Sequence, residues 1–118
     1  MKTLIVGAST NPERYAYKAA LSLLAHGHEI ELIGQRVGEI NGHEIHTNYP
    51  DFEGIDTVTI YVGPQNQTAL YNYILTQKPR RIIFNPGTEN PEFEKLAILK
   101  GIETEEACTL VLLAIGQF

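Results

Sequence analysis

The stretch that decides the fold is Lys2-Thr-Leu-Ile-Val-Gly-Ala-Ser-Thr-Asn-Pro12, at the start of a chain of 118 residues. A short apolar run stops at Gly7, and an amphipathic pattern begins after Pro12. Strand, glycine turn and helix in this order are typical of a phosphate-binding loop. The common dinucleotide fingerprint G-x-G-x-x-G has glycine at three positions, but here Ser9 and Pro12 occupy the second and third. We therefore predict a nucleotide-like ligand other than NAD.

The composition predicts one soluble domain over residues 1–118. Its apolar fraction is 43% and its charged fraction 19%, which suits a compact domain of common size. The N-terminus does not resemble a signal peptide, and no apolar run approaches the roughly 18 to 20 residues of a membrane span. A single cysteine, Cys108, excludes an internal disulfide and suits a reducing compartment. We expect a cytoplasmic protein without a membrane partner.

The charge distribution indicates where an anion would bind. The formal net charge of −5 argues against nucleic acid as a partner, because such proteins need a basic surface. Residues 1–36 hold four basic and three acidic residues and carry +1, whereas the remainder, with five basic and eleven acidic residues, carries −6. Positive charge is thus concentrated around the first loop.

Outward from this loop, strands alternate with helices. Ala16, Ala19, Ala20, Leu23 and Leu24 follow the spacing of a helix that packs on a sheet, and Gly27 ends it. Asn90 is expected to cap a later helix that ends at Gly101. The predicted strands are residues 2–6, 29–33, 57–62, 81–84 and 102–104. The pattern predicts an α/β protein with a Rossmann-like, doubly wound, five-stranded parallel sheet in three α/β/α layers.

Two segments fit this pattern less simply. Residues 34–56 form an insertion with a tight hairpin turn at Asn41-Gly42. Residues 107–115 are predicted as a last helix, although 110–115 are apolar all round, unlike a peripheral helix with one exposed side. This segment is either buried or packed against another subunit, which makes a homodimer possible.

Ligands of open parallel sheets bind beyond the carboxyl ends of the strands, so the loops there are the candidate site. Backbone amides of these loops and the helix dipole would hold a pyrophosphate, and Ser9 and Asn11 could add hydrogen bonds. The alternative is that Asn11 and Pro12 only cap the first helix.

Arg36 indicates the type of nucleotide. NAD sites usually carry a carboxylate about 20 residues after the glycines, whereas this chain has Gly34-Gln-Arg36 there. A guanidinium suits a phosphorylated ribose, as found in NADP and coenzyme A. An ordinary solvated arginine is the alternative for Arg36.

The first loop, Gly7-Ala-Ser-Thr-Asn-Pro-Glu-Arg-Tyr15, resembles that of small CoA-binding proteins. Val62-Gly-Pro64, residues 39–42, residues 85–90 and Cys108 also lie where that family has comparable elements. The domain is similar to the N-terminal half of the succinyl-CoA synthetase alpha subunit. The resemblance implies a Rossmann-like fold that holds the ADP part of coenzyme A. It implies phosphate contacts from Gly7, Ser9, Asn11, Arg14, Tyr15 and Lys18, and a path for adenine and pantetheine along Val62 and Pro64.

The chain departs from the family after the second strand, where the family commonly has Asn-Pro in place of Gly34-Gln-Arg36. Arg36 is retained as a phosphate ligand. The full set of predicted ligand-binding residues is Gly7, Ala8, Ser9, Asn11, Arg14, Tyr15, Lys18, Gly34, Arg36, Val62, Pro64 and Gly87.

Catalytic chemistry is not indicated. Cys108 has no histidine placed to activate it, and His43 and His46 would point to opposite faces of a strand, so no catalytic or metal-ligating residue is predicted. The main hypothesis is a protein that binds coenzyme A or an acyl-CoA. A small NADP-dependent or acyl-transfer enzyme and a regulatory subunit of a CoA ligase are the alternatives.

Overall fold

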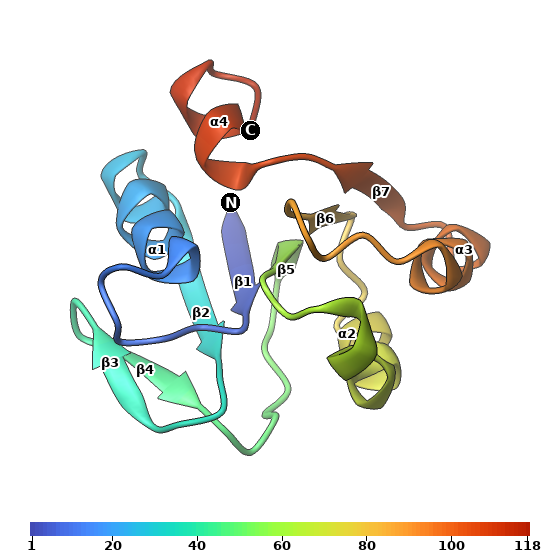
Figure 1. Ribbon diagram of the computed structural model, residues 1–118, viewed down its shortest axis with the longest axis horizontal. Coiled ribbons are helices and arrows are strands. Elements are labelled where there is room, and N and C mark those ends of the chain that lie inside the picture. Colours follow the sequence, from blue (N-terminus) through green and yellow to red (C-terminus); the bar gives the residue numbers. More distant parts are fainter.

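The computed structural model describes residues 1–118 and contains a seven-stranded sheet in the order β3-β4-β2-β1-β5-β6-β7 (Figure 1). All neighbouring strands are parallel except β3 and β4. The strands are β1 (Lys2–Val6), β2 (Glu29–Ile33), β3 (Gly38–Ile40), β4 (His43–His46), β5 (Ile55–Ile60), β6 (Arg81–Phe84) and β7 (Glu103–Glu106). The helices are α1 (Tyr15–Ala25), α2 (Tyr71–Thr76), α3 (Pro91–Leu99) and α4 (Thr109–Ala114), with short 3₁₀ turns η1 (Pro64–Asn66) and η2 (Thr68–Leu70).

The three-layer arrangement follows from strands that are apolar on both faces. Along β1, Leu4 and Val6 face a core with α2 and α3, whereas Ile5 faces a second core with α1 and α4. Alternate residues of a strand point to opposite faces, so an unbroken apolar run needs helices on both sides. The predicted doubly wound α/β fold is confirmed.

The five predicted strands are present and parallel, but the predicted number is wrong because the sheet has seven strands. The predicted turn is present, with φ of 48° at Asn41 and 82° at Gly42, but the residues flanking it form the additional strands β3 and β4. β4 joins the edge of β2 in parallel, through Leu32↔Ile45 and Ile33↔His46, and β3 is antiparallel to β4. A segment that the sequence presents as an insertion therefore extends the sheet.

Several boundaries also differ from prediction. β5 begins at Ile55 and ends at Ile60, two residues earlier than predicted at each end, because its ladder follows β1 from Lys2 to Val6. β7 extends from 103 to 106 rather than from 102 to 104, and α4 is shorter than the predicted 107–115 helix. The predicted cap of α3 is present, since the Asn90 side chain accepts a hydrogen bond from the Phe93 amide.

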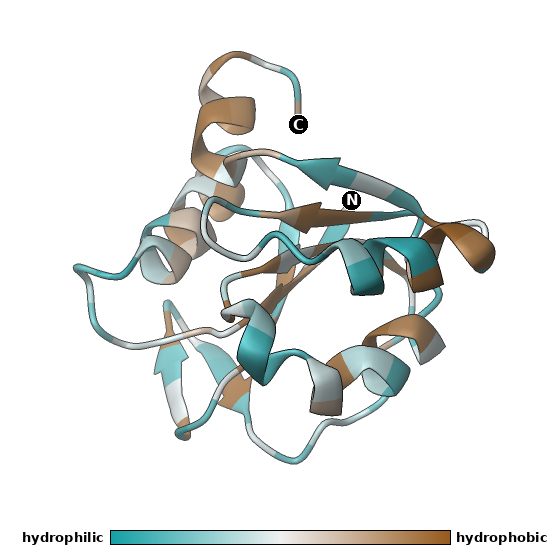
Figure 2. Cartoon of the chain, turned by 45° about the vertical axis from the view of Figure 1, so that its right-hand side comes forward, coloured by the Kyte–Doolittle hydropathy of each residue, from teal (hydrophilic) through white to brown (hydrophobic).

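The apolar helix α4 is buried on one side only. Leu112 and Leu113 are buried, whereas Val111 is 53% and Ile115 61% exposed. Figure 2 shows the helix as a hydrophobic element that projects from the body of the molecule. No helix has the length and apolar character needed to cross a membrane.

Candidate functional site: a cleft at the carboxyl edge of the sheet

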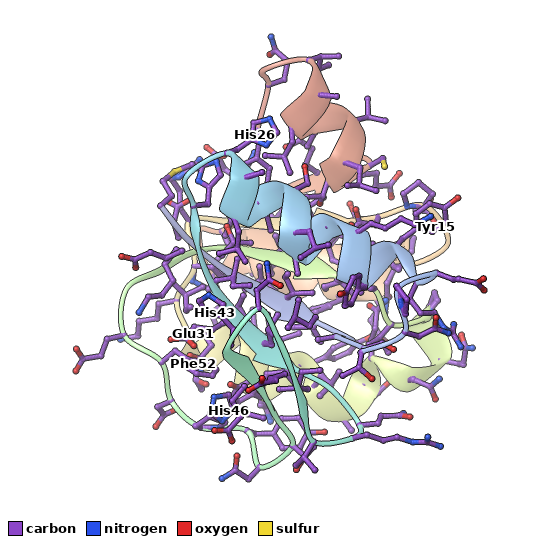
Figure 3. All side chains as sticks on the ribbon, turned by 90° about the vertical axis from the view of Figure 1, so that its left-hand side faces the viewer. Tyr15, His26, Glu31, His43, His46 and Phe52 are labelled. Carbon is purple, nitrogen blue, oxygen red and sulfur yellow. The ribbon has the colours of Figure 1, made fainter.

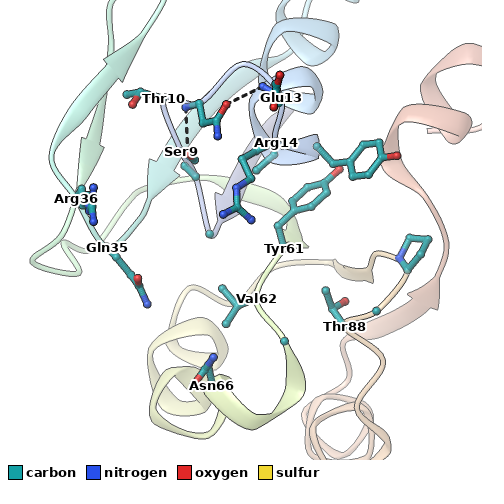
Figure 4. Close-up of a pocket in the computed structure, with 18 of the residues that line it drawn as sticks. Ser9, Thr10, Glu13, Arg14, Gln35, Arg36, Tyr61, Val62, Asn66 and Thr88 are labelled. Carbon is teal, nitrogen blue, oxygen red and sulfur yellow. Dashed lines mark hydrogen bonds between the residues drawn. The ribbon is translucent and has the colours of Figure 1, made fainter.

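A cleft of about 960 Å³ opens where the loops after β1, β2, β5 and β6 meet (Figure 4). This edge lies beyond the carboxyl ends of the parallel strands, at the point where the chain order reverses beside β1. The lining residues are Gly7 to Asn11, Glu13 to Ala16, Gln35 to Val37, Tyr61 to Gly63, Asn66 and Pro86 to Thr88. Loops far apart in sequence thus form one binding surface.

Gly7 is required by both conformation and space. Its φ of 98° is rarely adopted by other residues, and a Cβ there would lie 3.0 Å from Val62 Cγ2 and 3.1 Å from the Tyr61 carbonyl. The close approach brings the first loop against the end of β5. The glycine at the end of the predicted first strand therefore shapes the floor of the cleft.

The first loop is fastened to the end of β2. The amides of Gly7 and Ala8 both donate to the Ile33 carbonyl, at 2.9 and 2.8 Å. Gly34 lies directly beneath, where a Cβ would be 2.5 Å from the Ala8 carbonyl oxygen. Gly7 and Ala8 therefore shape the loop, and their amides are already bonded within the protein.

Asn11 stabilises the turn of this loop rather than the start of the helix. Its side-chain oxygen accepts a hydrogen bond from the Glu13 backbone amide at 3.0 Å. The backbone amide of Asn11 donates to Ser9 Oγ at 3.1 Å. The residue at the N-cap of α1 is Arg14, which makes no side-chain capping bond. The structure thus does not support the alternative in which Asn11 and Pro12 cap α1.

Four amides of this region are free to bind an anion. Those of Ser9, Thr10, Tyr15 and Ala16 donate no hydrogen bond within the protein. The latter two belong to the first turn of α1, where helix geometry leaves amides without partners and the dipole favours negative charge. The loop and the start of the helix thus both contribute free donors to residues that line the cleft.

Two cations line the cleft without an ion-pair partner. Arg14 and Arg36 both belong to its wall and take part in no salt bridge. In Figure 4 the Arg14 guanidinium reaches into the space between the first loop and Val62. Glu13 is the one acidic side chain of the wall, so the cleft carries net positive charge within a protein of net charge −5.

Nine of the predicted ligand-binding residues line the cleft, and three do not. Lys18 lies one turn along α1, with its Nζ 5.4 Å from the centre of the Tyr15 ring. Gly34 lies beneath the first loop, and Pro64 starts η1. The nine that line the wall are Gly7, Ala8, Ser9, Asn11, Arg14, Tyr15, Arg36, Val62 and Gly87.

The wall also contains residues that sequence reasoning missed. Gln35, Gly63 and Thr88 lie within the loops that were singled out, so position after a strand is the signal that finds them. No sequence signal pointed to Asn66, because its place in the wall depends on the turn η1, which brings it back to the cleft. The others are Thr10, Glu13, Val37, Tyr61 and Pro86, together with Ala16 at the start of α1.

The buried side-chain amides of Gln67 and Asn85 hold together the loops that form the floor of the cleft. Gln67 is fully buried and donates from Nε2 to the carbonyls of Val62 and Thr88, both at 2.8 Å, while its Oε1 accepts from Asn90. Asn85 donates to Thr59 Oγ1 and the Ile60 carbonyl and accepts from the Thr109 amide. The loops after β5 and β6 are therefore tied to each other and to the start of α4.

Tyr61 is the residue of the cleft wall whose pKa is clearly shifted from its ordinary value. Its hydroxyl is buried and has no hydrogen-bond partner, and burial raises the pKa of the phenol to about 12. A phenol with a pKa this high is protonated at physiological pH. Cys108, at the N-cap of α4, is not part of the wall.

The histidines do not converge. Figure 3 shows His26 far from His43 and His46, which belong to the hairpin. His46 packs edge-on against Phe52, with ring centres 5.4 Å apart, and no group of three or more metal-binding side chains is present.

Comparison with known proteins finds similarity over nearly the whole chain. A family model described as a CoA binding domain matches residues 1–114. A crystal structure of an uncharacterised protein is 53% identical, with a TM-score of 0.97 over 99% of this chain and 97% of that one. A Thermus thermophilus protein, 21% identical over 99% of this chain and 90% of its own, and a hypothetical Pyrococcus horikoshii protein, 24% identical over 92% and 78%, share the fold with TM-scores of 0.87 and 0.83. No curated protein matches. The resemblance stated from the first loop is confirmed, and the chain belongs to the CoA-binding domain family.

Proposed function

We propose that the protein binds coenzyme A or an acyl-CoA through the ADP part of the ligand, without catalysis of its own. The observation that carries the proposal is the group of free amides at Ser9, Thr10, Tyr15 and Ala16, which faces the same cleft as the unpaired Arg14. Amides at a helix N-terminus and a guanidinium are the groups that bind a pyrophosphate. Membership of the CoA-binding domain family supports the choice of ligand.

The two ends of the ligand take different directions from the pyrophosphate. In sheets of this type the ribose lies at the end of the second strand, which is here the loop with Arg36. The adenosine 3′-phosphate of CoA is then within the range of the Arg36 guanidinium. The pantetheine arm extends the other way, towards Pro86, Gly87 and Thr88.

Binding without turnover is supported by the residue types of the wall. It contains neither histidine nor cysteine, the phenol of Tyr61, one of its two tyrosines, has a pKa raised to about 12, and its acidic residue, Glu13, has no partner base. A hydride-transfer enzyme that uses NADP would also need a site for its second substrate.

Calorimetric titration with CoA, dephospho-CoA, NADP and NAD tests the proposal. We expect CoA to bind most tightly, because it alone carries both the pyrophosphate and the 3′-phosphate. Absence of CoA binding at millimolar ligand would refute the proposed function. Tighter binding of NADP, with NADPH consumed in the presence of a metabolite panel, would favour the enzyme alternative.

Arg36→Ala is predicted to weaken CoA binding by about 1.5 to 3 kcal/mol, the range for a hydrogen bond to a charged group. Dephospho-CoA should bind the variant as it binds the original protein, because it lacks the phosphate that Arg36 contacts. Arg14→Ala is the comparison, since loss of a pyrophosphate contact weakens both ligands. Equal losses for both ligands in Arg36→Ala would contradict the assignment.

We also propose that the exposed side of α4 forms a homodimer. Val111 on this short helix and Ile115 at its C-cap, four residues apart, are large exposed apolar side chains. Light scattering should give twice the mass of the chain, and Ile115→Glu should return the monomer. Leu99→Glu, at an 82% exposed position on α3, is the control and should leave the mass unchanged. A monomer at high concentration contradicts the dimer, and copurification with a larger ligase would favour a regulatory subunit instead.

A further inference from the structure

One end of the cleft carries two side-chain amides without partners. Gln35 follows β2 and Asn66 ends η1, and both are exposed and donate or accept no side-chain hydrogen bond. In Figure 4 Gln35 lies to the left of Val62 and Asn66 below it, so the two side chains reach the same part of the cleft from different loops. Val37 also lines this end, and its apolar side chain is 75% exposed. This end of the cleft therefore combines two unpaired side-chain amides with an exposed apolar side chain.

This region lies where the base of a bound nucleotide would be. With the pyrophosphate at α1 and the ribose at the end of β2, the base extends between the loop after β2 and the loop after β5. These are the loops that carry the two amides. The argument rests on the proposed function, because it takes the position of the pyrophosphate from it.

We propose that the carboxamides of Gln35 and Asn66 recognise the adenine base, with Val37 and Val62 against its faces. A carboxamide presents an acceptor and a donor side by side, which matches the N6 amino group and N7 of adenine. This end of the cleft has no carboxylate, the group that would pair with the donor edge of guanine. The two amides are therefore the residues that determine base specificity.

The test compares CoA with its deaminated analogue, in which hypoxanthine replaces adenine. Deamination turns the N6 donor into an oxygen acceptor, so a carboxamide can no longer bond both positions. The original protein should prefer CoA by about tenfold, within the range for one bidentate amide pair. Gln35→Ala and Asn66→Ala should each reduce this ratio, and the double variant should bring it near one.

Two controls separate base recognition from general damage. Gln65→Ala changes a neighbouring exposed amide outside the cleft wall and should keep the tenfold ratio. The preference of each variant for CoA over dephospho-CoA should also persist, because Arg36 is unchanged.

The outcomes distinguish the two proposals. Tight CoA binding with the same ratio in all variants, or equal binding of the hypoxanthine analogue by the original protein, would overturn base recognition and leave the proposed function standing. No measurable binding of CoA would refute both.

Discussion

Gln67→Met is expected to lower the free energy of unfolding by about 3 kcal/mol, because it leaves two carbonyl groups and the Asn90 side-chain amide without their hydrogen-bond partner, at a cost of about 1 to 3 kcal/mol for each group that stays buried. The two carbonyls are those of Val62 and Thr88, each 2.8 Å from Gln67 Nε2. Methionine approximately preserves the volume, so the loss reports the hydrogen bonds rather than a cavity. The effect is large for a domain whose total stability is about 5 to 15 kcal/mol. Denaturant unfolding at constant slope measures it.

The same substitution should weaken CoA binding. Val62 and Thr88 belong to the cleft wall, and Gln67 ties the two loops that carry them. Gln65→Met is the matched control, because Gln65 is exposed on the adjacent turn and should change stability by no more than about 0.5 kcal/mol. Equal stabilities for the two variants would show that water replaces the lost donors and that the tie between the loops is dispensable.

Gly34→Ala is expected to lower the free energy of unfolding by about 3 kcal/mol, the upper part of the usual range for overpacking. The added Cβ would lie 2.5 Å from the Ala8 carbonyl oxygen and 2.8 Å from Ile45 Cγ2. The first of these atoms is backbone, so the first loop must move away from β2. The movement strains the bonds from Gly7 and Ala8 to the Ile33 carbonyl and displaces the donors that we assign to the pyrophosphate.

Thermal unfolding and calorimetry with CoA measure both consequences. Gly54→Ala is the control: Gly54 has a φ of 72° and open space around it, so alanine there costs about 1 to 2 kcal/mol of backbone strain. It should leave CoA affinity unchanged. If Gly34→Ala bound CoA as tightly as Gly54→Ala does, the contact between the first loop and β2 would not control the site.

The fold was largely predictable because its main signals are local. The apolar run before Gly7 and the helical spacing after Pro12 predict β1 and α1 without reference to the rest of the chain. The strands of the hairpin were not predicted, because β3 and β4 have three and four residues and one buried isoleucine each. Such short segments show no periodicity, and their place in the sheet depends on pairing with β2.

The candidate site was predictable in its location but not in its donors. Strand ends mark the loops, and most of the predicted residues do line the cleft. The sequence could not show which backbone amides are free to bind a ligand. The amides of Gly7 and Ala8 donate to the Ile33 carbonyl, which belongs to another strand. Gln67 could not be identified either, since an isolated glutamine in a polar turn is normally exposed.

The sequence by itself thus determined the strand, glycine turn and helix at the start of the chain, the α/β alternation and the Asn90 cap. These features depend on the spacing of nearby side chains and on the backbone freedom of single residues, which act over a few positions. The tertiary structure alone decided the hairpin edge of the sheet, the set of free amides and the buried ties made by Gln67 and Asn85. Each of these requires a hydrogen-bond partner that is distant along the chain, and only the folded backbone brings the two together.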